Sequence, residues 1–184
     1  MVASAEVEAA EAVSNMIYIS TYTSPIGDIL LASNNNKLIG LWFKGQKYYM
    51  NSIKEEVEEK HDEETLMKAK KWLDRYFKGE KPSIKELPLN PDGTEFRKKV
   101  WQILCEIPYG STITYKEIAL KLAKEKGFKS LSAQAVGGAV GHNPISIIIP
   151  CHRVVGSNGK LTGYAGGLDK KEYLLELEKI ERKI

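Results

Sequence analysis

Hydrophobic and polar positions alternate along the first part of the chain with the period of a β-sheet. Three apolar runs separated by short turns predict strands joined as an antiparallel meander, at residues 17–22, 29–32 and 38–43. A charged stretch over residues 54–64 then leads into a predicted helix that Gly79 ends. The apolar face of this helix repeats at helical spacing and consists of Leu66, Ala69, Trp72, Leu73, Tyr76 and Phe77.

Proline and glycine punctuate the middle of the chain. Pro82, Pro88 and Pro91 precede a turn signal at residues 92–93, so a domain boundary is expected near residue 92. A new helix is predicted from about Thr94, and packing suits the cysteine at its end, Cys105, better than reactivity does. Its apolar stripe consists of Phe96, Val100, Ile103 and Leu104.

Two short helices are predicted next. The first begins at Tyr115, where Thr114 and Glu117 match a capping box, and ends at Gly127. The second covers residues 132–140, consists mainly of small residues, and is followed by Asn143 and a proline. Such a pair resembles a helix-turn-helix, and small side chains permit close approach to the protein's own core or to DNA. Each glycine inside a helix costs about 1 kcal/mol of stability relative to alanine. Because this cost falls in a basic part of the chain, close approach to DNA is favoured over close packing against the protein's own core.

Residues 147–149 are β-branched and run into Pro150, after which three reactive side chains are adjacent: Cys151, His152 and Arg153. Proline biases the residue before it towards extended geometry, so a buried extended segment is predicted to deliver the thiol to a fixed place. The basic neighbours favour the thiolate, which is the nucleophilic form. Buried cysteines are usually inert, but burying histidine and arginine beside one is costly, so the reactive interpretation is favoured.

The chain ends in a further predicted helix, which Asp169 and Glu172 cap and whose apolar face includes Leu174, Leu177 and Ile180. Glu178 borders this face, where a partly buried carboxylate needs a partner, and His152 is the best candidate. The spacing equally allows a glutamate at the edge in water. The preceding glycine-rich run, residues 163–167, lacks the spacing of a phosphate cradle and fits either a plain connection or a wall for a flat ligand beside Tyr164.

Composition and charge narrow the class of protein. The hydrophobic fraction of 42% is that of an ordinary globular protein, and residues 93–184 hold 15 basic against 9 acidic residues, which suits a polyanionic partner. No apolar run could cross a membrane, and residues 1–15 lack the features of a signal peptide, so we expect a flexible extension or added leader and a cytoplasmic protein. Two cysteines without C-x-x-C spacing predict neither a disulfide framework nor a zinc site.

The run PCHRV at residues 150–154, with GHNP at residues 141–144 and GYAGG at residues 163–167, closely resembles the active-site region of the O6-alkylguanine-DNA alkyltransferases. The resemblance continues in register from about Gly93 to Glu178. It implies an α+β fold, with a small ribonuclease-H-like amino-terminal domain built on an antiparallel sheet over residues 16–92. Residues 93–184 are then expected to form a mainly helical, winged helix-turn-helix-like domain.

The resemblance also implies a reaction. Cys151 is expected to take the alkyl group from O6-alkylguanine in double-stranded DNA once and irreversibly, as a suicide alkyltransferase that acts as a monomer without cofactor or metal. His152 would receive the thiol proton through a water, and Glu178 would orient His152. Asn143 is expected to order the turn that holds the cysteine. Tyr115 would help to rotate the nucleotide and would protonate the departing base.

Contacts with the base and with DNA follow from the same resemblance. The main-chain carbonyls of Val154 and Cys151 are expected to read the exocyclic amine, and Tyr164 and Ala165 to border the pocket. The DNA contacts are expected from Tyr115, Ala133, Gln134, Gly137 and Arg153. Gln134 stands where the family has an intercalating arginine, and it can fill the gap left by the extruded base without adding charge.

The chemistry is physically consistent. A guanine oxygen is inaccessible inside a stacked duplex, so the base has to be extruded. Displacement at an alkyl carbon needs a soft, strong nucleophile and a protonated leaving group, which a thiolate and a phenol supply. Two alternatives stay open: a lesion-binding protein without catalysis, against which the retained Cys151 argues, and a Cys-His thiol hydrolase, which would turn over repeatedly. The sequence leaves activity on O4-alkylthymine open.

Overall fold

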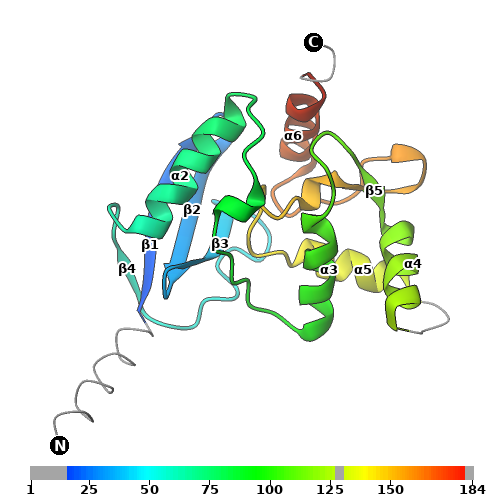
Figure 1. Ribbon diagram of the computed structural model, residues 1–184, viewed down its shortest axis with the longest axis horizontal. Coiled ribbons are helices and arrows are strands. Elements are labelled where there is room, and N and C mark those ends of the chain that lie inside the picture. The colour runs from blue at the N-terminus through cyan, green and yellow to red at the C-terminus, as the bar shows by residue number, and fades with distance from the viewer. Residues whose placement is uncertain (1–15, 127–130, 181–184) are drawn as a thin grey trace, which may run out of the picture.

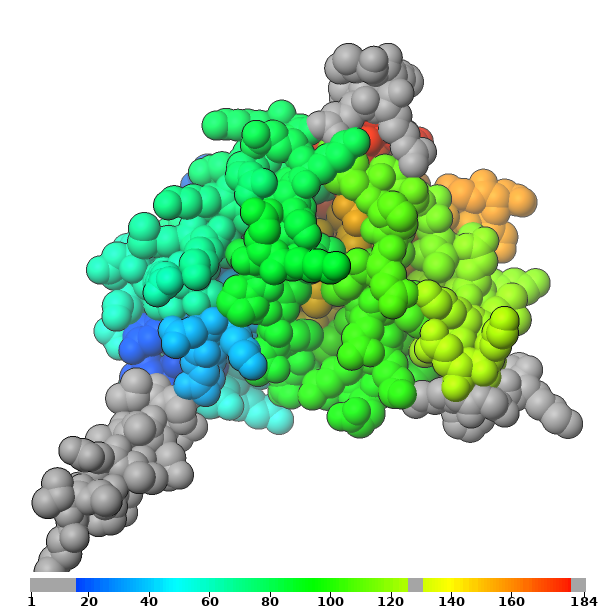
Figure 2. Space-filling view, in the orientation of Figure 1, coloured from blue at the N-terminus to red at the C-terminus, as the bar shows by residue number. Residues whose placement is uncertain are grey.

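The computed structural model describes residues 16–126 and 131–180, so the predictions made for residues 1–15 and for Gly127 lie outside the described residues. The fold is α+β, as predicted. A sheet with one helix packed on it lies on one side of the molecule, and a mainly helical part lies on the other (Figure 1). The space-filling view shows the two parts lying directly against each other (Figure 2).

The amino-terminal part is a four-stranded sheet in the order β3-β2-β1-β4. The predicted meander is confirmed, because β1 pairs with β2 and β2 with β3, both antiparallel. The fourth strand was not predicted; it arises from the charged stretch and pairs parallel with β1. The strands are β1 (Ile17–Ser24), β2 (Gly27–Asn34), β3 (Lys37–Phe43) and β4 (Val57–Glu59).

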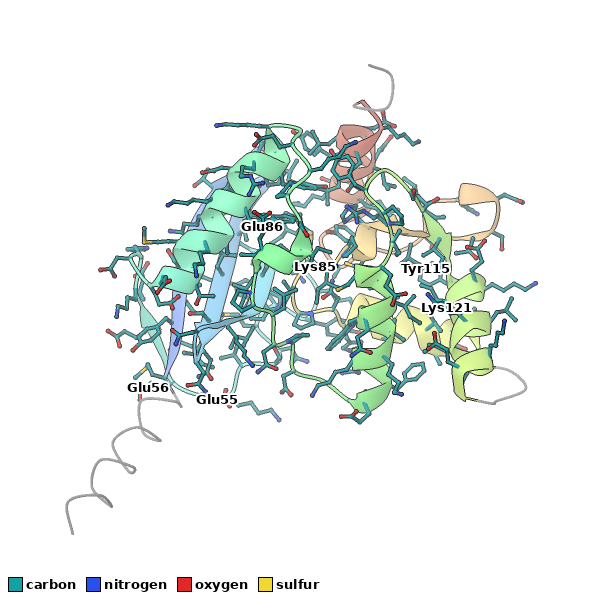
Figure 3. The ribbon with its side chains drawn as sticks, in the orientation of Figure 1. Glu55, Glu56, Lys85, Glu86, Tyr115 and Lys121 are labelled. Atoms are coloured by element: carbon teal, nitrogen blue, oxygen red, sulfur yellow. The ribbon has the colours of Figure 1, made fainter. Side chains whose placement is uncertain are left out.

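Helix α2 (Glu64–Phe77) packs its apolar face on this sheet, and the buried residues include most of the predicted stripe. Gly79 follows the cap residue Lys78, and its φ of 87° lies in the left-handed region that favours glycine, which agrees with its predicted role as the helix stop. The short helix η1 (Ile84–Glu86) follows and carries the labelled Lys85 and Glu86 (Figure 3).

In the described residues of the carboxy-terminal part there are four longer helices and a two-stranded parallel pair, β5 (Ile113–Thr114) with β6 (Val154–Val155). The capping box predicted at Thr114 and Glu117 is confirmed, since each backbone N–H donates to the other side chain, at 3.2 and 3.1 Å. None of the described helices is both long and apolar enough to cross a bilayer. The four helices are α3 (Glu95–Cys105), α4 (Tyr115–Lys126), α5 (Ala133–Gly141) and α6 (Leu168–Ile180).

The predicted extended segment at residues 147–149 is wrong. These residues form consecutive turns, and Cys151 begins a short 3-10 helix, η2 (Cys151–Arg153). Ile147 has a φ of 69°, which is a rare and costly conformation for a β-branched residue. β-Branched composition predicted burial correctly, since Ile147, Ile148 and Ile149 are at most 2% exposed, but local hydrogen bonds override its strand preference.

One continuous hydrophobic core joins the two parts. It runs from sheet residues such as Leu41, through α2 and α3, to the cysteine segment and Leu174 of α6. The edge strand β3 also pairs with the chain before the cysteine: the Leu41 N–H donates to the Pro144 carbonyl at 2.8 Å, and the Ser146 N–H donates to the Leu41 carbonyl at 3.0 Å. The amino-terminal sheet therefore holds the cysteine segment in place directly.

Candidate active site

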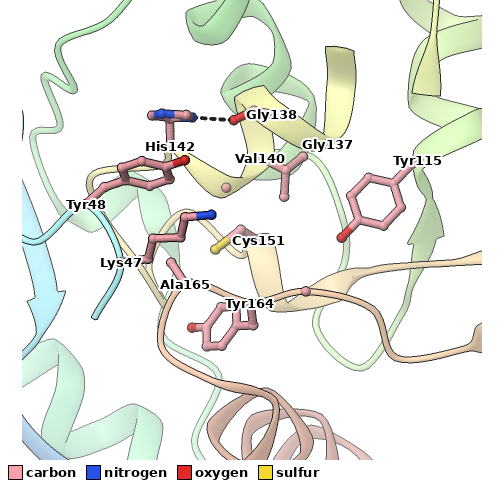
Figure 4. Close-up of a pocket in the computed structure, with 12 residues that line it drawn as sticks. Lys47, Tyr48, Tyr115, Gly137, Gly138, Val140, His142, Cys151, Tyr164 and Ala165 are labelled. Carbon is pink, nitrogen blue, oxygen red and sulfur yellow. Dashed lines mark hydrogen bonds between the residues drawn. The ribbon is translucent and has the colours of Figure 1, made fainter. Parts of the chain in front are cut away.

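Cys151 lies at the floor of a cavity of about 380 Å³, and only 4% of the residue is exposed. A volume of this size is in the range of small-ligand sites. Both parts of the chain line the cavity, as Figure 4 shows. The lining residues are Lys47, Tyr48, Tyr115, Gly137, Gly138, Val140, Gly141, His142, Cys151, Gly163, Tyr164 and Ala165.

Asn143 orders the turn that carries the cysteine, as expected. Its side-chain amide donates to the Ile149 carbonyl at 2.8 Å and to the Ile145 carbonyl at 3.3 Å. Its side-chain oxygen accepts from the Ile145 N–H at 3.0 Å. A single buried side chain thus satisfies three backbone groups, which offsets the strain at Ile147 and fixes where the sulfur lies.

The thiol environment differs from the prediction. Burial raises the pKa of Cys151, while a hydrogen bond from Asn143, the charge of Lys171 and the nearby backbone N–H groups lower it without reversing the shift. The side chains of His152 and Arg153, which were expected to favour the thiolate, point to Glu178 instead. The thiol is therefore neutral at rest, and a base has to take its proton when it reacts.

Glu178 is the centre of a buried hydrogen-bond network. It is 1% exposed, and its carboxylate accepts from the Tyr76 hydroxyl at 2.8 Å, from Arg153 Nε at 2.7 Å and from the Gly110 N–H at 3.1 Å, as well as from His152 Nε2. Burial alone would raise its pKa, but the bond with His152 and the charge of Arg153 bring the pKa down to about 2. The predicted pairing of Glu178 with His152 is confirmed, and the alternative of a solvated edge glutamate is wrong.

The charge state of the network determines the tautomer of His152. Burial lowers the pKa of His152, outweighing the raising effect of Glu178, so the ring is neutral. Because Glu178 is ionised and can only accept, His152 Nε2 has to carry the hydrogen. The lone pair then lies on Nδ1, which is buried and has no hydrogen-bond partner within residues 16–126 and 131–180. His152 is consequently a neutral base with one ring nitrogen free to accept a proton.

The structure buries two residues that were predicted to contact DNA or the base. Arg153 is 7% exposed, its Nη1 donates to the Ile107 carbonyl at 2.8 Å, and its Nε is bound to Glu178, so it is not placed to contact DNA. Val154 is fully buried and does not line the cavity, and its carbonyl accepts from Lys171 Nζ at 2.6 Å. A carbonyl oxygen has two lone pairs, so its contact with the base stays a prediction. The resemblance implied both roles, and the structure shows that the Arg153 side chain of the 3-10 turn is directed inward to Glu178.

Lys171 was missed by the sequence reasoning. It is fully buried, and its ammonium donates to the Val154, Thr162 and Gly163 carbonyls at 2.6, 2.9 and 3.2 Å. Burial lowers its pKa to about 8. These bonds tie α6 to β6 and to the loop that carries Tyr164, and they place a cation near the thiol.

The face beside Tyr115 is open. Tyr115 lies at the start of α4 (Figure 3), and its hydroxyl points into the cavity (Figure 4). Ala133 and Gln134 are exposed at the start of α5, and Gly137 lines the cavity. A Cβ added at Gly137 would meet only the Tyr115 ring, at 3.9 Å, and one added at Gly138 would meet nothing within 4 Å. The protein's own packing therefore does not require these glycines.

The amino-terminal part supplies a wall of the site that the sequence did not suggest. Its loop after β3 brings Lys47 and Tyr48 to the cavity, and the Tyr48 ring stacks on His142 with centroids 3.9 Å apart. The Lys47 N–H donates to the Ala165 carbonyl at 3.1 Å. Tyr164 and Ala165 border the cavity as predicted, so the glycine-rich run is a wall rather than a plain connection. Contacts so distant in sequence leave no local pattern by which to find them.

No group of three or more His, Cys, Asp or Glu side chains in the described ranges could hold a metal ion. Cys105 is separate from the site and only partly exposed, and burial raises its pKa to about 11, which fits the predicted packing role.

Comparisons with known proteins agree on one family. The 6-O-methylguanine DNA methyltransferase ribonuclease-like domain matches residues 17–91, and the DNA binding domain of the same name matches residues 95–180. A methylated-DNA--protein-cysteine methyltransferase of Methanosarcina barkeri is 49% identical, covering 88% of this chain and 97% of the relative. One of Haemophilus influenzae is 42% identical, covering 89% and 87%. A crystal structure of Mycobacterium tuberculosis OGT in complex with DNA has a TM-score of 0.75 and 40% identity, covering 90% and 93%.

Proposed function

The chain belongs to the 6-O-methylguanine DNA methyltransferase family, and from this premise we propose that Cys151 accepts the alkyl group of O6-alkylguanine in DNA, once per molecule. The position of its thiol is the observation that supports Cys151 as the acceptor. It lies at the floor of a cavity, beside a neutral histidine that an ionised glutamate orients.

The proton has to leave the thiol as the sulfur attacks, because burial keeps the resting thiol protonated. His152 Nδ1 takes this proton through a water, since Glu178 occupies the other ring nitrogen. The Asn143 amide, the nearby N–H groups and the Lys171 charge then stabilise the negative sulfur. These groups are already held by the fold, so they need no rearrangement during the reaction.

The transfer step balances without a further reagent. The sulfur forms a bond to the alkyl carbon, and the bond between that carbon and the guanine oxygen breaks with its electron pair going to guanine. Guanine gains the equivalent of the proton that the thiol gives up, with the Tyr115 hydroxyl donating to the base from across the cavity. The product is a stable thioether, which explains a single turnover.

DNA reaches the site on the face that α4 and α5 form, which acts as a helix-turn-helix. The base has to leave the duplex to reach Cys151. The glycines of α5, which packing does not require, allow the DNA backbone to approach closely, and the exposed Gln134 fills the space left in the stack. We expect the protein to act on double-stranded DNA as a monomer.

Mass spectrometry after incubation with O6-benzylguanine, and with a duplex containing O6-methylguanine, tests the assignment. We expect one alkyl group per protein, located on Cys151 and absent from Cys151→Ala. Cys105→Ala is the matched control, because that thiol lies outside the cavity, and it should retain the adduct. Repeated turnover would instead indicate a thiol hydrolase, and binding without an adduct would indicate a lesion-binding protein.

A further inference from the structure

The loop over residues 44–53 holds the backbone of Lys47 in a defined place at the wall of the cavity that contains Cys151. The Lys47 N–H donates to the Ala165 carbonyl at 3.1 Å, and the Lys47 carbonyl accepts from the Gln46 side chain at 3.2 Å. Gln46 is itself 9% exposed and accepts from the Phe43 N–H at 2.8 Å. The backbone of Lys47 is thus fixed from both sides, by the sheet and by the wall that carries Tyr164.

The Lys47 side chain extends into the cavity. Lys47 and Cys151 both line the cavity, and in Figure 4 the Lys47 side chain and the Tyr115 hydroxyl enter it from opposite sides. A base whose alkylated oxygen faces the sulfur and whose ring faces Tyr115 therefore directs its alkyl group to the side where Lys47 lies. In that orientation Lys47 would neighbour the transferred group rather than the guanine ring.

Lys47 also sets the charge of the cavity. No aspartate or glutamate is among the described residues that line it, and Lys47 is the one lysine or arginine among them. Within the described ranges no carboxylate lies at ion-pair distance from its ammonium, which instead sits 5.2 Å from the centre of the Tyr48 ring. A cation without a protein counter-charge at the mouth of an otherwise uncharged cavity attracts an anionic group.

We propose that Lys47 makes the site prefer alkyl groups that carry a carboxylate, such as the carboxymethyl group of O6-carboxymethylguanine. This inference rests on the proposed function and adds a substrate class to it. The reaction is unchanged: the sulfur bonds to the methylene carbon, the carbon–oxygen bond breaks, guanine leaves with the proton, and the carboxylate stays on the thioether. Lys47 contributes by pairing with the carboxylate while the methylene carbon approaches the sulfur.

The experiment compares two lesions of equal size in the same duplex. O6-carboxymethylguanine and its neutral amide analogue, O6-carbamoylmethylguanine, differ in charge, so the ratio of their transfer rates to Cys151 isolates the charge preference. We expect Lys47→Met to lower this ratio by about fivefold, the effect of one partly exposed ion pair, and the ratio in wild-type protein to fall with added salt. Lys47→Arg should retain the preference. Lys44→Met, which removes the same charge from an exposed position outside the cavity, should not change the ratio.

The outcomes distinguish a failure of the Lys47 inference from a failure of the proposed function. An unchanged ratio in Lys47→Met overturns the inference, and equal slowing of both lesions would show that Lys47 binds a DNA phosphate instead. If the wild-type protein takes no alkyl group from O6-methylguanine, the proposed function itself fails, whatever the ratio for the larger lesions.

Discussion

Replacing Glu178 by glutamine tests the buried network on which the site depends. The substitution preserves the size of the side chain but removes its negative charge. Glu178 is 1% exposed and accepts hydrogen bonds from Tyr76, Gly110, His152 and Arg153. In Glu178→Gln the guanidinium of Arg153, itself 7% exposed, is left without its counter-charge, which is a costly state for a buried cation.

The size of the expected loss of folding stability follows from the pKa of Glu178. Despite the raising effect of burial, the partners lower it from 4.5 to about 2. A shift of that size corresponds to about 3 kcal/mol of folding stability at neutral pH. Because the pKa is lower in the folded state, this contribution is fully present above pH 4.5 and is lost as the pH falls towards 2. At pH 3 about 1.5 kcal/mol of it remains.

Urea unfolding followed by circular dichroism at pH 7, 5 and 3 measures this difference. We expect Glu178→Gln to be less stable than wild type by about 3 kcal/mol at pH 7 and pH 5, and by about half of that at pH 3. The matched control is Glu86→Gln, which breaks the 2.8 Å pair with Arg75 on the surface and should change stability little. A Glu178→Gln protein as stable as wild type, or a deficit independent of pH, would refute the proposed charge state of the network.

Three further predictions concern other residues of the site. Burial lowers the pKa of Lys171 to about 8, so as the pH rises this lysine loses its proton in the folded protein before it does in the unfolded chain. Wild type should therefore gain stability relative to Lys171→Met between pH 8 and 10.5. The same urea titrations measure this gain. Asn143→Ala removes three hydrogen bonds from the cysteine turn and should lower stability by about 2 kcal/mol and slow benzyl transfer, measured by denaturation and by adduct formation. Gln134→Arg adds a positive charge at the exposed start of α5 and should tighten duplex binding in a salt-dependent manner, and an unchanged affinity in a titration with labelled duplex would contradict a DNA contact there.

The sequence predicted the elements whose signals are local. The three strands of the meander and the capping box at Thr114 and Glu117 depend on residues a few positions apart, and all are present. The strand expected at residues 147–149 is absent, because the Ile148 and Ile149 N–H groups donate to carbonyls only two and four residues earlier and the Asn143 side chain binds the Ile149 carbonyl. Strand preference is a weak signal when local turn hydrogen bonds compete with it.

The residues of the candidate site that belong to a sequence motif were predictable, and those that only tertiary contacts bring to the site were not. Cys151, His152 and Glu178 were found and are together. Lys171 resembles any helical lysine in the sequence, and only the structure shows that its ammonium is fully buried against three carbonyls. Tyr76 was assigned to a helix core, which is correct, yet its hydroxyl also reaches Glu178, 102 residues later in the chain. Periodicity indicates that a side chain is buried but not which polar group it meets.

The contacts across the predicted boundary near residue 92 make the amino-terminal part a component of the site. Tyr76 donates to the carboxylate that orients His152, and Leu41 pairs with the backbone on both sides of Ile145, just before the cysteine turn. Lys47 reaches the cavity from the same part. The turn at Ile147 is strained, and such a turn persists only where surrounding structure holds it. Since part of that surrounding structure is β3, the geometry of Cys151 depends on the sheet as well as on the half of the chain that contains the thiol.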